Sequence, residues 1–367
     1  MSDDLTQTDD HSAANDTAAN GPSYVDWSFA KATGARLVQA GPAVKREEAR
    51  EAVAQIRQLA AEAVEPVAET ARLHAPGAAP APVVIDRPTW IAVNADSMSS
   101  LMDPVFAQLM ASREDTPSAA VTAIGSKVTG AEAGVLLSFL AGKVLGQYDL
   151  APSGTPKLLL VAPNMVQVGR EMRVDETDFR RWVCMHEETH RVQFTAVPWL
   201  REHLIGEARG LAADMTPDQE SLQERLQQLV TRLPEAFSGN GGGLADLLAS
   251  PQTREKVAQL TAVMSLLEGH ADVVMDEVGP EVIPTVEEIR RKFNARRSGQ
   301  SAVDRLLRRL LGLDAKMRQY KDGAVFVRAV IDEVGWDGLN AVWTSPDTLP
   351  KPLEISDPKA WVARVHG

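Results

Sequence analysis

The chain has 367 residues, of which 44% are hydrophobic, and its formal net charge at pH 7 is −12. This length allows one large domain or two ordinary ones, and the hydrophobic fraction is sufficient for a packed core. The acidic balance disfavours nucleic acid as a partner. No apolar run reaches the roughly 18 residues that span a bilayer. A single cysteine, Cys184, excludes an intrachain disulfide.

The N-terminal residues 1–22 are polar and acidic and lack any hydrophobic periodicity, so we expect a disordered tail. They have neither the basic start nor the apolar segment of an ordinary signal peptide. Together with the single cysteine, this predicts a cytoplasmic protein.

Three segments of the N-terminal part have patterns typical of regular structure. Val44–His74 is alanine-rich with one apolar face, which predicts a helix that Pro66 kinks or divides. Val83–Ile85 is a short apolar run and is interpreted as a strand. Gly130–Gln147 is small and apolar throughout, which predicts a buried core helix.

A leucine-rich segment, Lys157–Pro163, is the clearest predicted strand, and its proline ends it. If Leu158–Val161 lies at the edge of a sheet, an extended peptide could pair with it by strand addition. The alternative is an interior strand, and the sequence does not distinguish the two.

The segment Phe179–Phe194 has the pattern of a helix and contains His186-Glu187-Glu188-Thr189-His190. Two histidines four positions apart lie on one helix face, where their imidazoles can chelate one metal ion, and zinc suits such ligands best. Glu187 is then placed to hold and deprotonate a water that the zinc activates. The motif therefore predicts a metallohydrolase.

The helix around these histidines is apolar on two sides, which predicts that it is buried and that the imidazoles point inward. Buried imidazoles need partners, and a metal ion is one. A random chain of this length contains the pattern roughly once in a hundred cases, so a chance occurrence must be considered. In that alternative, His186 and His190 are core histidines satisfied by hydrogen bonds.

A third zinc ligand is predicted on a later apolar helix, Ser265–Met275. Glu268 and Asp272 share a face, so Glu268 can bind the metal while Asp272 accepts the free ring N–H of a zinc-binding histidine. His270 is an alternative ligand, with Asp272 less favoured in that role. His270 and Tyr148 are also candidate donors to the oxyanion of a tetrahedral intermediate.

The combination of H-E-x-x-H with a later E-x-x-x-D resembles the gluzincin class of zinc metallopeptidases, which implies that Glu268 is a ligand and Asp272 supports one. The 77 residues between His190 and Glu268 imply a helical insertion. The whole chain resembles the zincin-like metallopeptidase type 2 proteins of actinobacteria, also called hydrolases, some of which are labelled as associated with biosynthesis of a deazaflavin coenzyme. The matching segments are Val25–Trp27, Asp86–Ile91, Val144–Asp149, Val161–Asn164, the His186 helix through Leu200, Glu268–Asp272, and Leu349–Pro350 through Asp357–Trp361.

Downstream segments predict further helices. Met215–Leu233 is amphipathic, Gly239–Gly243 is a flexible break and Thr253–Val278 is helical. Basic residues cluster between positions 289 and 309. They are interpreted either as a solvated face that pairs with the chain's acids or as a dock for an acidic partner. The end of the chain is expected to form mixed turns.

The sequence thus predicts a mainly α fold with a small β-sheet (α+β), a zincin-like metallopeptidase core with helical elaborations. After the tail, residues 23–367 are expected to form one domain, with a helical part 23–150, a zinc-site core 151–280 and a basic helical and C-terminal part 281–367. The predicted function is a zinc-dependent cytoplasmic metallopeptidase for a peptide or small amide, in which His186, His190 and Glu268 bind zinc and Glu187 is the general base. The alternative is a catalytically silent zinc-binding scaffold or regulatory protein.

Overall fold

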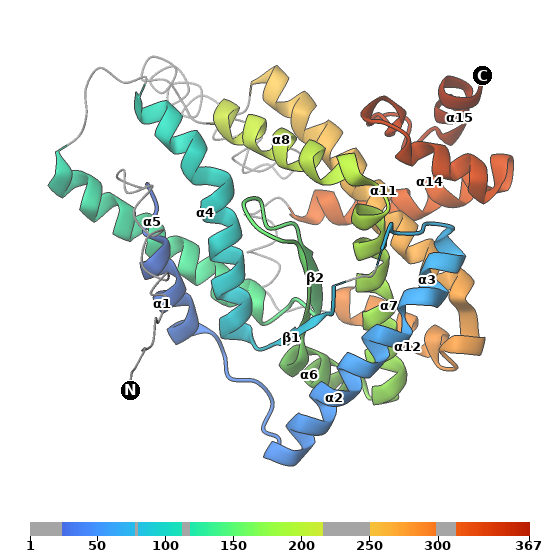
Figure 1. Ribbon diagram of the computed structural model, residues 1–367, viewed down its shortest axis with the longest axis horizontal. Helices are drawn as coiled ribbons and strands as arrows, with labels where there is room; N and C mark the ends of the chain where they lie inside the picture. The colour runs from blue at the N-terminus through green and yellow to red at the C-terminus, as the bar shows by residue number, and fades with distance from the viewer. Residues whose placement is uncertain (1–23, 78–79, 112–117, 216–249, 299–312) are drawn as a thin grey trace, which may run out of the picture.

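The computed structural model describes residues 24–77, 80–111, 118–215, 250–298 and 313–367. Within this part the chain is mainly helical and has one three-stranded sheet, as predicted (Figure 1). The predicted tail, the segment that follows Met215 and the glycine-rich break at 239–243 lie outside the described residues.

The sheet consists of β1 (Val83–Ile85), β2 (Gly146–Asp149) and β3 (Lys157–Val161) in the order β1-β3-β2. β3 pairs with β1 in parallel and with β2 antiparallel. The leucine-rich segment is therefore the interior strand, and the edge interpretation was wrong. The edges of the sheet are formed by β1 and β2.

Helices cover both faces of the sheet, so that it lies between two apolar cores (Figure 1). Leu159 and Val161 of β3 face the smaller core, and Leu160 between them faces the larger one, as the alternation of a strand requires. The helices of the smaller core are α1 (Trp27–Leu37), α4 (Arg87–Ala111) and α5 (Ala119–Ala141). Those of the larger core include α2 (Arg46–Glu62), α3 (Val64–Ala71), α6 (Ala162–Met172), α7 (Glu176–Thr195), α8 (Pro198–Met215), α11 (Pro251–Val282), α12 (Val286–Ser298), α14 (Leu313–Leu339) and α15 (Pro358–His366).

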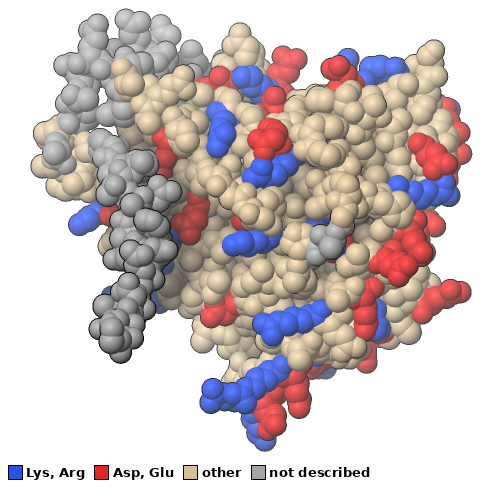
Figure 2. All heavy atoms as spheres, in the orientation of Figure 1, with Lys and Arg blue, Asp and Glu red and all other residues tan. Residues whose placement is uncertain are grey.

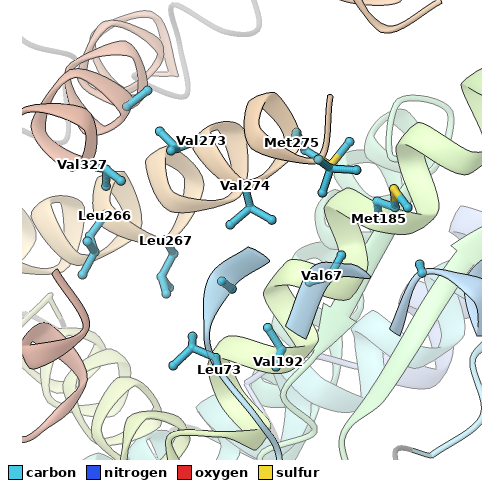
Figure 3. Close-up of a cluster of buried hydrophobic side chains, with 14 of the residues drawn as sticks. Val67, Leu73, Met185, Val192, Leu266, Leu267, Val273, Val274, Met275 and Val327 are labelled. Carbon is cyan, nitrogen blue, oxygen red and sulfur yellow. The ribbon is translucent and has the colours of Figure 1, made fainter. Parts of the chain in front are cut away.

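One part of the larger core lies where α7 meets α3 and α11. Met185 and Val192 of α7 lie among the buried side chains of Val67 from α3 and of Leu267 and Val274 from α11 (Figure 3). This packing fixes the position of α7, the helix that carries the H-E-x-x-H sequence, relative to α11.

Helix α5 differs from its prediction. It ends at Ala141, and residues 146–149 form strand β2 rather than a continued helix. The predicted segment is also not fully buried, because Val135 within it is 53% exposed. By length and composition alone, Ala120–Ala141 would be long and apolar enough to cross a membrane, contrary to the sequence expectation.

Proline has different effects in two helices of the N-terminal part. The segment 44–74 is divided at Ala63, and Pro66 lies in the first turn of α3, where a missing N–H costs little. Helix α4 instead continues through Pro104. The C-terminal region, predicted as turns, contains the long helix α14 and the short α15 besides two 3-10 turns, Asn340–Trp343 and Pro346–Thr348.

The described part of the basic region forms ion pairs within the chain. On α12, Arg290 pairs with Asp276, Lys292 with Glu288 and Arg296 with Glu171. Basic and acidic side chains are likewise interspersed on the face drawn in Figure 2. This arrangement agrees with the interpretation of a solvated, paired face, while residues 305–309 lie outside the described part.

Candidate metal centre

The start of helix α7 is fixed by local sequence. The side chain of Asp175 accepts hydrogen bonds from the N–H groups of Thr177 and Asp178, which satisfies the first turn. Glu176 and Asp178 add negative charge at the positive end of the helix dipole. About three turns after this start, the helix brings His186 and Glu187 to the cleft beside β2.

The two histidines of α7 and Glu268 of α11 converge on one point. His186 Nε2 and His190 Nε2 are 3.3 Å apart, and the carboxylate of Glu268 lies 3.8 Å and 3.7 Å from them. Bonds of about 2.0–2.1 Å in a tetrahedral zinc site place ligand atoms roughly 3.3–3.5 Å apart. The three side chains therefore fit a zinc ion with small adjustments, and together they offer a donor set used by catalytic zinc sites.

A close contact between two helices positions Glu268. Gly269 on α11 packs against Gly323 on α14 so tightly that a Cβ atom at 269 would lie 2.2 Å from the carbonyl carbon of Gly323. A Cβ at Gly323 would lie 2.0 Å from the carbonyl oxygen of Ser265. These glycines let the backbones touch, and the contact fixes α11 at the residue next to the ligand.

Glu187 lies beside His186, His190 and Glu268 and is 8% exposed. Burial raises the pKa of its carboxyl to about 7; His190 lowers this pKa and the carboxylate of Glu268 raises it further. A bound divalent cation would favour the charged form and lower it. A carboxyl group with a pKa near neutrality can both accept and release a proton at physiological pH.

The cleft that contains these groups has a volume of about 430 Å³. Tyr148 of β2 is on its wall, stacked on Phe194 with ring centroids 5.5 Å apart, and burial raises the pKa of its hydroxyl, which stays protonated as a donor. Most of the remaining lining is apolar: Val144, Leu145, Leu150, Trp182, Val183, Leu204, Met264, Leu267 and Phe293.

The structure places His270 away from the cleft. Its ring is fully buried, and its Nδ1 atom lies 3.0 Å from Nε2 of Gln193. Burial, with a smaller effect from His190, lowers the pKa of His270 to about 3, so the ring is neutral. Among the described residues it is not part of the group that could hold a metal ion.

Asp272 lies one helical turn beyond Glu268 on α11. Its backbone carbonyl accepts a hydrogen bond from Arg290. Burial lowers the pKa of His190, but Glu268, Glu187, the hydrogen bond with Gln193 and, with the smallest effect, Asp272 raise it, and the net shift is upward. The role of Asp272 in orienting a histidine stays a prediction.

Gln193 is a site residue that sequence reasoning missed. Its Oε1 lies 3.1 Å from Nδ1 of His190, and the side chain is completely buried. The signal was present in the sequence, because a residue three positions after His190 shares its helix face. A polar residue on the buried face of this helix could therefore have been predicted as a partner of His190.

Comparisons with known proteins agree with this geometry. The family described as zincin-like metallopeptidase matches residues 25–362. Among solved structures, a "putative hydrolase with a novel fold" from Chloroflexus aurantiacus is similar, with a TM-score of 0.65 and 29% sequence identity over 93% of this chain and 99% of that one. No curated protein matches.

Proposed function

Because the chain belongs to the zincin-like metallopeptidase family, we propose that it is a zinc-dependent hydrolase, and specifically a metallopeptidase that cleaves an amide bond with water. The observation that carries this proposal is the convergence of His186, His190 and Glu268 beside Glu187 in one cleft. When bound there, zinc supplies a Lewis acid that polarises the carbonyl and lowers the pKa of water to about 7.

Glu187 is the general base in this proposal. Its carboxylate takes a proton from the attacking water and passes it to the leaving amine, and its buried position beside the ligands supports both transfers. Tyr148 on the cleft wall donates a hydrogen bond to the oxygen of the attacked carbonyl. Asp272 helps to orient a histidine ligand.

The substrate in this proposal is a peptide or a small amide. The sheet edge at β2 lies on the cleft wall with Gly146 and Tyr148, and an extended peptide can pair with such an edge by strand addition. The apolar lining favours apolar side chains near the cleaved bond. We propose no nucleic-acid partner, because the net charge is −12.

The cytoplasmic location is part of the proposal as well. It is supported by the single cysteine, Cys184, which is buried and free, as is usual in a reducing compartment. The alternative of a silent zinc scaffold would require a fourth protein ligand to close the metal site. The described residues supply three such ligands at this position.

The test is a digest of a peptide library by the zinc-loaded native protein and by Glu187→Gln with the same zinc content. We expect chelator-sensitive cleavage by the native protein and a loss of at least about a hundredfold in the variant, as is typical for removal of a general base. Equal cleavage by both proteins would remove Glu187 from the mechanism. If the zinc-loaded native protein cleaves neither the peptide library nor a panel of small amides, the result supports the scaffold interpretation.

A further inference from the structure

A chain of buried polar side chains leads from His190 away from the cleft. Gln193 Nε2 lies 2.9 Å from the carbonyl oxygen of Leu267. A carbonyl oxygen only accepts hydrogen bonds, so the amide nitrogen of Gln193 must face it. The amide oxygen of Gln193 then faces His190 and accepts the hydrogen of His190 Nδ1 at 3.1 Å.

This arrangement defines the tautomer of His190. With its proton on Nδ1, the ring directs the lone pair of Nε2 toward His186 and Glu268, where a metal ion would lie. The opposite tautomer would place an N–H where the metal must bind. Gln193 therefore selects the form of His190 that can be a ligand.

The orientation of Gln193 is held from its other side by His270. The second hydrogen on Gln193 Nε2 points to Nδ1 of His270 at 3.0 Å, and since an amide nitrogen only donates, Nδ1 of His270 is the acceptor. The same amide nitrogen thus has two acceptors, Leu267 O and His270 Nδ1, and a rotation of the amide by 180° would break both bonds. Gln193 and His270 are fully buried, and buried polar atoms such as Gln193 Nε2 and His270 Nδ1 are costly unless they are hydrogen-bonded.

The ring of His270 packs against two tryptophan rings from the C-terminal region. Trp343 and Trp336 lie nearly perpendicular to it, with ring centroids 5.4 Å and 5.9 Å away. Trp343 is anchored in turn, because its indole N–H donates to Asn340 and its carbonyl accepts from Trp199. Helix α14, which contains Trp336, and the 3-10 turn with Trp343 thus contact His270, which in turn contacts Gln193 beside the proposed metal centre.

We propose that Gln193 is a positioning residue of the metal centre, and that His270, held between Trp336 and Trp343, fixes Gln193 so that His190 keeps its metal-binding tautomer. This inference rests on the proposed function, because it assigns a task to Gln193 only if His190 binds a metal. It gives the buried His270 a role that needs no contact with metal or substrate.

The test measures zinc affinity by competition with a chelator and the visible absorption spectrum of the cobalt-substituted protein. Gln193→Met keeps the size of the side chain but removes both hydrogen bonds, and it should weaken zinc binding about 10- to 100-fold and alter the cobalt spectrum. His270→Phe should weaken binding to a lesser degree. Gln55→Met is the matched control, because Gln55 bonds Thr177 and Arg180 in the N-terminal part of α7. It should leave both readouts unchanged.

Gln193→Glu separates positioning from packing and remains informative if the methionine variant does not fold. A protonated glutamate keeps an oxygen that accepts from His190 Nδ1 and a hydroxyl that can donate to the carbonyl oxygen of Leu267, so zinc affinity should stay within about tenfold of native. Zinc affinity within twofold of native in a folded Gln193→Met protein would overturn the inference, as would a loss above tenfold in Gln193→Glu. Failure of the native protein to bind zinc would instead refute the proposed function.

Discussion

Gly146 on β2 lies directly against the side chain of Glu187 on α7: a Cβ atom at position 146 would be 2.5 Å from Glu187 Cγ and 2.7 Å from Cδ. Such distances are shorter than van der Waals contact, so only glycine fits here without movement of the strand or the glutamate. The contact places Glu187, the proposed general base, directly beside the edge strand β2, which is the proposed substrate-binding edge.

Gly146→Ala should therefore displace the carboxylate of Glu187 while leaving the three ligands in place. We expect normal zinc content and a fall in kcat of about a hundredfold, the effect of roughly 1 Å of misplacement at a reacting centre. Gly154→Ala is the control, because a Cβ there meets only Ala151 at 3.7 Å. Unchanged kcat in Gly146→Ala would show that the strand and base adjust without cost.

Gly269→Ala should separate α11 from α14. The added methyl group would lie 2.2 Å from backbone atoms of Gly323, which cannot rotate away as a side chain could. We expect a loss of about 1–3 kcal/mol in the free energy of unfolding, measured by denaturant titration, and weaker zinc binding. In contrast, Gly206→Ala on α8 meets no atom within 4 Å and should stabilise the protein by up to about 1 kcal/mol.

Tyr148→Phe keeps the stacking on Phe194 but removes the hydroxyl. If this hydroxyl donates to the developing oxyanion, kcat should fall by about 10²- to 10³-fold while KM and zinc content change little. Steady-state kinetics on a peptide found in the library digest provide the measurement. An effect confined to KM would instead assign Tyr148 to substrate binding.

The metal-free protein should become less stable as the pH rises through the range in which Glu187 titrates. The usual pKa of a glutamate is 4.5, and burial raises that of Glu187 to about 7. Between these values the folded state binds more protons than the unfolded state, so the free energy of unfolding decreases with rising pH. Glu187→Gln has no proton to lose here, and its gain in Tm over the native protein should be larger at pH 8 than at pH 5.

Melting curves in the presence of a chelator check this prediction. Glu255→Gln, at an exposed position of α11, controls for the loss of one negative charge. A gain in Tm that is equal at both pH values, or larger at pH 5, would contradict the raised pKa.

The H-E-x-x-H helix was predictable from sequence because its signal is local. His186, Glu187 and His190 lie within five residues on one helix, and helix geometry alone places both imidazoles on one face. Glu268 was chosen from a spacing on another helix, and a distance between two helices depends on packing that no local pattern encodes. The structure places it within 4 Å of both histidines.

Three other features depended on long-range contacts and could not be predicted from local sequence patterns. Strand β2 was interpreted as the end of a helix because Gly146–Asp149 forms a strand only by pairing with β3. The same pairing decided that β3 is interior. Similarly, the environment of His270 is created by Trp336 and Trp343, more than 60 residues further along the chain.

The central claim is that His186, His190 and Glu268 hold one zinc ion, and an anomalous difference map of crystals of the zinc-loaded protein at the zinc absorption edge tests it most directly. We predict one strong peak about 2.0–2.2 Å from Nε2 of both histidines and from a carboxylate oxygen of Glu268. Elemental analysis should find that this zinc is lost in His186→Ala. A peak at another position, or none between these three side chains, would contradict the account.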